Sequence, residues 1–130
     1  MRHWSIATLA AALAIGGSGA WAGNSSTPAP AMPASTPAQE ALADQLSEAG
    51  LKYYGSWRCP ACQYQGRLFG QSALERLPYI ECAKPDALPE QAQACRSAAI
   101  EAYPTWIHPS GERRTGVQSL NELQRWIQQP

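Results

Sequence analysis

The feature that most constrains this chain is the segment Trp57-Arg58-Cys59-Pro60-Ala61-Cys62, which follows the short, mostly apolar run of residues 51–55. Two cysteines three positions apart lie on one face of a helix, where they can bond to each other or exchange partners. A helix that begins near Cys59 points its free N–H groups and its positive dipole end at that sulfur, which stabilises a thiolate. Thiolates attack disulfides, so the motif predicts dithiol chemistry with Cys59 as nucleophile and Cys62 as resolving partner. A purely structural bridge and a metal site are the alternatives.

Residues 1–22 have the pattern of an export signal. A short polar start precedes an apolar run from Trp4 to Ile15, and Ala20-Trp21-Ala22 has small residues where a signal peptidase cleaves. The alternative is an uncleaved anchor, because residues 4–22 approach the span of about 20 residues that crosses a bilayer. We expect a soluble protein after cleavage, in the periplasm or another exported compartment, which would be the thylakoid lumen in a photosynthetic source.

Residues 23–36 are uncharged, rich in Ser, Pro and Ala, and without periodicity, so they predict an extended tether. The remaining residues, 37–130, are enough for one small domain. Without Arg2 the chain has one more acidic than basic residue, scattered along its length. This balance provides no positively charged surface of the kind that binds nucleic acid. We expect the protein to be a monomer.

Strand and helix patterns alternate along this domain, which predicts an α/β fold with a sheet between helices. The expected helices span residues 37–49, 59–69, 89–102 and 119–128, and the expected strands span residues 51–54, 79–81, 105–107 and 114–117.

This order of elements resembles the thioredoxin fold, with W-x-C-x-x-C after the first strand and Tyr103-Pro104-Thr105 before the third. The similarity is closer to one branch, the thioredoxin-like domain fused to or partnered with bacterial vitamin K epoxide reductase homologues. It covers residues 51 to 127 and implies a central mixed sheet of about four strands with flanking helices. Five blocks carry it: residues 54–63 with Leu68 and Phe69, residues 78–82, residues 93–95, residues 103–107 and residues 115–120.

The resemblance implies a function. Cys59 would attack and Cys62 would resolve, in exchange with client proteins and with a membrane quinone reductase of the vitamin K epoxide reductase type. Pro104 would be a cis-proline facing the dithiol, Tyr103 would offer its backbone to an extended client segment, and Trp57 would pack beside the cysteines. No cofactor is implied. The alternatives are a disulfide-stapled binding module without turnover and a periplasmic disulfide reductase.

One departure from ordinary thioredoxins bears on the direction of electron flow. Thioredoxins keep a buried acid six residues before the first cysteine, where this chain has Tyr53, and residues 51–58 contain no Asp or Glu. The dipeptide Pro60-Ala61 also lacks the His found there in several strong oxidants. We therefore expect an oxidising but not extreme potential, which favours an oxidase over a dedicated reductase.

The second cysteine pair is Cys82 and Cys95. The resemblance to the family implies that they bond to each other, whereas the number of cysteines by itself allows three different disulfide pairings. Such a bond would be a structural staple contributing about 3 kcal/mol, or alternatively a redox relay. A zinc site would need a second closely spaced pair, which the 12 residues between these cysteines do not provide. His108 is expected to be a solvated turn residue, so no metal is predicted.

Overall fold

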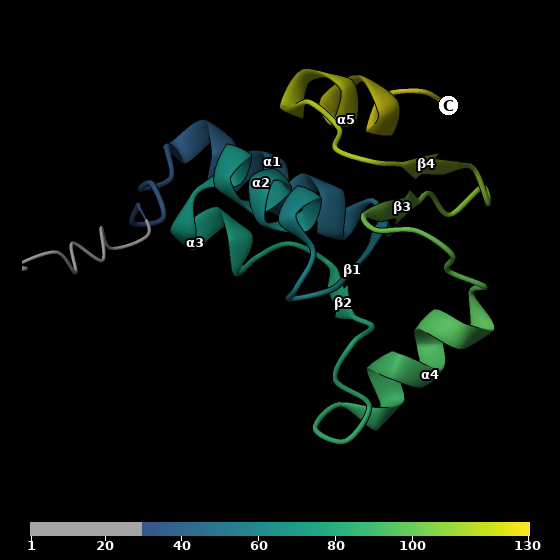
Figure 1. The fold of residues 1–130 in the computed structure, drawn as a ribbon. Helices are drawn as coiled ribbons and strands as arrows, with labels where there is room; N and C mark the ends of the chain where they lie inside the picture. Colours follow the sequence, from purple (N-terminus) through teal and green to yellow (C-terminus); the bar gives the residue numbers. More distant parts are fainter. Residues whose placement is uncertain (1–29) are drawn as a thin grey trace, which may run out of the picture.

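The computed structural model of the chain describes residues 30–130, and its four strands form one mixed sheet in the order β2-β1-β3-β4 (Figure 1). The central strand β1 (Lys52–Gly55) pairs in parallel with β2 (Tyr79–Glu81) and antiparallel with β3 (Thr105–Ile107). The edge strand β4 (Arg113–Thr115) pairs antiparallel with β3. The predicted export signal and the tether up to residue 29 lie outside the described residues.

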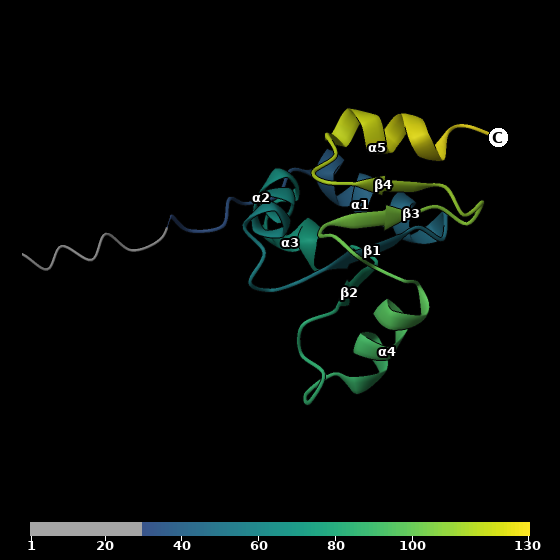
Figure 2. The same ribbon diagram turned by 45° about the vertical axis from the view of Figure 1, so that its right-hand side comes forward.

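Five helices flank this sheet within residues 30–130. Helices α1, α2, α3 and α5 contact one another in one group, whereas α4 contacts β2 and lies apart from that group (Figures 1 and 2). The sheet and its helices have the arrangement of a thioredoxin-like α/β fold. The helix bounds are α1 Pro37–Glu48, α2 Pro60–Phe69, α3 Gln71–Leu74, α4 Pro89–Ser97 and α5 Leu120–Ile127.

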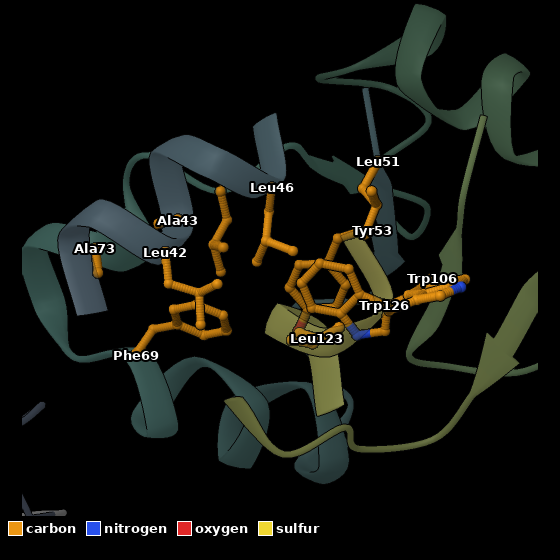
Figure 3. Close-up of a cluster of buried hydrophobic side chains, with 11 residues drawn as sticks. Leu42, Ala43, Leu46, Leu51, Tyr53, Phe69, Ala73, Trp106, Leu123 and Trp126 are labelled. Atoms are coloured by element: carbon orange, nitrogen blue, oxygen red, sulfur yellow. The ribbon is translucent and has the colours of Figure 1, made fainter. Parts of the chain in front are cut away.

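The main core lies between the sheet and the group of four helices (Figure 3). Tyr53 of β1 stacks on Trp106 of β3, with ring centroids 4.3 Å apart and planes only 5° from parallel. Leu46 of α1, Phe69 of α2 and Leu123 of α5 are fully buried against them. Burial of aromatic side chains is the largest source of stability available to a small domain, so this cluster fixes how the helices sit on the sheet.

The structure differs from the sequence expectation at the end of α4 and in having an additional short helix, α3. Helix α4 ends at Ser97 and not near residue 102, because Ala99 adopts a left-handed φ of 51° and the Ile100 N–H turns back to the Cys95 carbonyl. The short helix α3 was not expected at all. It begins at Gln71, directly after Gly70, whose φ of 83° lets the chain turn sharply after α2.

The last residues of the predicted tether lie against the domain. The Pro33 carbonyl accepts the Gln71 N–H at 2.9 Å, and the Ser35 hydroxyl accepts the Ala73 N–H at 2.9 Å. Arg67 of α2 donates to the Pro30 carbonyl at 3.1 Å. The first two bonds satisfy free backbone N–H groups at the start of α3, and the third ties the segment to α2. Together they explain why an uncharged, Pro-rich segment takes a defined path here. Across residues 30–130, each helix is too short or too polar to span a bilayer.

Candidate active site

The two closely spaced cysteines lie where β1 gives way to α2. Cys59 is the residue that caps α2, and its sulfur accepts the Cys62 N–H at 3.2 Å. Pro60 follows as the first helical residue, where a missing N–H costs nothing. Both cysteines are free thiols, but Cys59 is half-exposed and Cys62 is only 7% exposed. Cys59 is therefore the sulfur that an incoming protein can reach.

The loop before β3 faces the dithiol. The Tyr103–Pro104 peptide bond is cis, and the Cys59 thiol donates to the Tyr103 carbonyl at 3.7 Å. Pro104 is fully buried, whereas the Tyr103 side chain is exposed. The Gly116 N–H donates to the Pro104 carbonyl at 2.8 Å, which ties this loop to the chain leaving β4.

Trp57 lies two residues before Cys59, between β1 and α2, and is 48% exposed. Two cations lie over its ring: the Arg58 guanidinium at 4.7 Å and the Lys84 ammonium at 5.5 Å from the ring centroid. Gln63 donates to the Trp57 carbonyl at 3.0 Å and so anchors this loop to α2. The result is an exposed aromatic surface with a cationic rim, close to the reactive sulfur.

The environment of Cys62 differs from that of Cys59. Burial is the main cause that raises the pKa of the Cys62 thiol to about 12, and its side-chain hydrogen bond with Cys59 adds to this effect. The Tyr53 hydroxyl donates to the Cys62 carbonyl at 3.2 Å, which holds the first turn of α2 against β1. Cys62 therefore keeps its proton at neutral pH, and the two sulfurs have distinct chemical roles.

A cavity of about 350 Å³ lies beside Cys62. Its walls include Trp57, Tyr79, Glu81 and Met32, the last from the segment that precedes α1. Glu81 is only 4% exposed. Residues 51–58 contain no acid, as the sequence shows, but β2 brings a carboxylate to the same place because Glu81 is the register partner of Gly55. One feature of the sequence could have indicated this role: Glu81 follows Tyr79 and Ile80 in the same strand, and alternation along a strand places it on the same face as Tyr79.

Gln65 is a second residue that sequence reasoning missed. Its side chain is fully buried in α2, and its amide bonds both ways to the Gln118 backbone: it donates to the carbonyl at 3.0 Å and accepts the N–H at 2.8 Å. Because Gly116 in the same segment holds Pro104, this pairing links the dithiol helix to the cis-proline loop. A polar residue three positions after Cys62 on a buried helix face was the only hint.

Cys82 and Cys95 form a disulfide with Cα atoms 5.7 Å apart. It joins the chain just after β2 to the buried face of α4. His108 lies in the turn after β3, where its Nδ1 is 2.8 Å from the Ser110 hydroxyl oxygen. Among residues 30–130, no three His, Cys, Asp or Glu side chains gather closely enough to hold a metal ion.

Comparison with known proteins identifies a relative of this chain. Over 76 residues, 56% of this chain, the sequence is 42% identical to the thiol-disulfide oxidoreductase LTO1 of Arabidopsis thaliana. Both the name of this relative and the Cys59–Cys62 pair support thiol–disulfide redox chemistry. The aligned segment spans 20% of the relative's length. No family model matches the chain.

Proposed function

We propose that this protein is an exported thiol–disulfide oxidoreductase that oxidises dithiols in client proteins through Cys59 and Cys62. The observation that carries the proposal is the asymmetry of the pair: a half-exposed sulfur at a helix start, and a buried sulfur one turn behind it. The Cys59 sulfur accepts the Cys62 N–H at the start of α2, so the sulfur that a client can reach is also the one held by the helix backbone.

The exchange would proceed in two steps from the oxidised protein. A client thiolate attacks the Cys59 sulfur, the Cys59–Cys62 bond breaks, and Cys62 leaves as a thiolate that takes up a proton. A second client thiolate then attacks the client sulfur of the mixed disulfide, and Cys59 leaves as a thiolate. Two electrons pass from the client to the protein, and the client gains a disulfide.

Clients would bind along the surface formed by Trp57, Tyr103 and Pro104. The Tyr103 carbonyl already accepts a hydrogen bond from the Cys59 thiol, so an extended segment that meets Cys59 also meets this backbone. The side chains of Trp57 and Tyr103 are both exposed and provide apolar contact area.

We further propose that the reduced pair is re-oxidised by a membrane quinone reductase of the vitamin K epoxide reductase type. The support is the five-block sequence resemblance to domains fused to or partnered with such reductases. In liposomes that contain such a reductase and a quinone, the reduced protein should become oxidised catalytically, and a Cys59→Ser variant should not.

The oxidase assignment is tested by two measurements on the same protein. Oxidised protein mixed with a reduced two-cysteine peptide should yield the peptide disulfide, read by mass spectrometry, and Cys59→Ser should yield none. Equilibration against glutathione buffers should give a reduction potential above the value of about −270 mV typical of thioredoxin. A potential at or below that value would support a reductase. Alkylation of Cys59 no faster than a model thiol would support an inert binding module.

A further inference from the structure

The buried position of Cys62 creates a chemical requirement. Whenever a mixed disulfide on Cys59 is resolved by Cys62, the Cys62 thiol must first lose its proton, because the thiolate is the attacking form. Because the Cys62 residue is only 7% exposed, bulk water has little access to that proton. A nearby group that can accept the proton would remove this barrier.

Two side chains of β2 lie at the required place. Tyr79 and Glu81 are two residues apart on one strand and so project from the same face of the sheet, next to Gly55 of β1. A Cβ atom on Gly55 would lie 3.2 Å from the Cys62 sulfur and 3.3 Å from the Tyr79 hydroxyl oxygen. The Cys62 thiol and the Tyr79 hydroxyl therefore both lie against Gly55, the one residue of β1 that has no side chain.

The Tyr79 hydroxyl in turn points to the carboxylate. It donates to Glu81 Oε2 at 2.8 Å, so its oxygen lone pairs remain available to accept a proton. The other carboxylate oxygen, Oε1, accepts the Ala83 N–H at 2.8 Å and thereby fixes the orientation of the group. Cys62, Tyr79 and Glu81 also line the same cavity of about 350 Å³.

We propose that Glu81, acting through the Tyr79 hydroxyl, accepts the proton of Cys62 when Cys62 resolves a mixed disulfide. The proposal rests on the thiol–disulfide exchange put forward above and adds the residues that control its second step. Sequence reasoning found no base because it searched the strand that leads into the dithiol, whereas this acid comes from the neighbouring strand.

The step balances as follows. The thiol proton moves to the Tyr79 oxygen while the Tyr79 hydroxyl proton moves to Glu81, so the phenol stays neutral and the carboxylate becomes a carboxylic acid. The Cys62 thiolate attacks the Cys59 sulfur, the Cys59–Cys62 bond forms, and the bond from Cys59 to the other sulfur breaks. The departing thiolate carries away the electron pair. In client oxidation the same proton returns from Glu81 to Cys62.

The other titratable groups around Cys62 are less suited to this role. The Tyr53 hydroxyl donates its proton to the Cys62 carbonyl, and burial strongly raises its pKa. Cys59 is occupied in the mixed disulfide. Lys84 lines the cavity, but a charged ammonium has no lone pair and accepts no proton. Among the groups that the structure places around Cys62, Glu81 is the carboxylate.

The two chemical steps can be timed separately with 5,5′-dithiobis(2-nitrobenzoate). The reduced protein releases one coloured thiolate when Cys59 attacks the reagent and a second when Cys62 resolves the mixed disulfide. Glu81→Gln keeps the shape of the side chain and one accepting oxygen, but its amide is a far weaker proton acceptor than the carboxylate. Tyr79→Phe keeps the ring that packs on Tyr53 and removes the hydroxyl. Glu90→Gln, an exposed glutamate of α4, is the matched control.

We expect the second phase to slow by about tenfold or more in Glu81→Gln and in Tyr79→Phe, with the first phase unchanged within about twofold. In wild type the second rate should depend weakly on pH near neutrality. In Glu81→Gln it should rise about tenfold per pH unit, because hydroxide must then remove the proton. Glu90→Gln should match wild type in both phases.

Three results would overturn the proposal: a second phase unchanged in both variants, a parallel loss of both phases, or an unchanged pH profile in Glu81→Gln. Failure of the underlying function is distinguishable, because the wild-type protein would then release the first thiolate no faster than a model thiol.

Discussion

Removal of the Cys82–Cys95 disulfide decides whether this bond is a staple or a relay. The perturbation is the double substitution Cys82→Ala and Cys95→Ala. To keep the active-site pair from affecting the comparison, both the parent and the variant carry Cys59→Ser and Cys62→Ser. Any effect of those two serines is then common to both proteins and cancels.

The magnitude follows from the sequence separation of 13 residues between the bonded cysteines. In the chain-entropy model, closing a loop of this size in the unfolded chain is worth about 3 kcal/mol. A domain of roughly 95 residues unfolds with an entropy of about 0.2 kcal/mol/K, so this loss lowers the melting temperature by about 15 °C. Because the effect comes from loop closure, Cys95→Ala alone should cost nearly as much as the double substitution.

The assay is urea unfolding followed by tryptophan fluorescence, together with a thermal melt. A double variant that melts within about 3 °C of its parent would refute the staple. A second measurement tests the relay, with Cys59 and Cys62 restored: re-oxidation by the proposed membrane quinone reductase should proceed at the normal rate. Normal stability combined with lost re-oxidation would identify Cys82–Cys95 as a relay.

Three further outcomes are expected. Cys59→Ser should abolish turnover, whereas Cys62→Ser, mixed with a client that contains a disulfide, should trap a mixed disulfide between Cys59 and the client, visible as a reducible adduct on a gel. Gln65→Leu should lower the free energy of unfolding by about 3 kcal/mol, measured in urea, because two partly buried backbone groups of Gln118 lose their partners; a cost below about 1 kcal/mol would contradict this. The free energy of unfolding of the reduced protein should fall between pH 9.0 and about 12, because the unfolded Cys62 thiol ionises there while the folded one keeps its proton. A Cys62→Ala variant should lack that component, and identical pH curves for the two proteins would contradict the assignment.

Several elements of this fold could be read from short stretches of sequence because their causes are local. Helix α2 begins where a cysteine that can cap is followed by proline, and α5 begins at a Ser119–Glu122 capping box. The alternation of strands and helices was enough to expect a layered α/β domain. Helix α4 shows the limit of such reasoning, since its Ala-rich sequence favours continuation past Ser97, whereas the left-handed turn at Ala99 ends it.

The sequence by itself determined the dithiol at a helix start, because two cysteines at this spacing on a capped helix need no distant partner. Only the tertiary structure decided what surrounds it. Glu81 reaches Cys62 because β2 pairs in parallel with β1, and Gln65 meets Gln118 across 53 positions of chain. Burial of the aromatic core fixes the sheet register and the positions of the helices, and these in turn bring the polar groups together. No local pattern in the chain encodes which polar groups will meet.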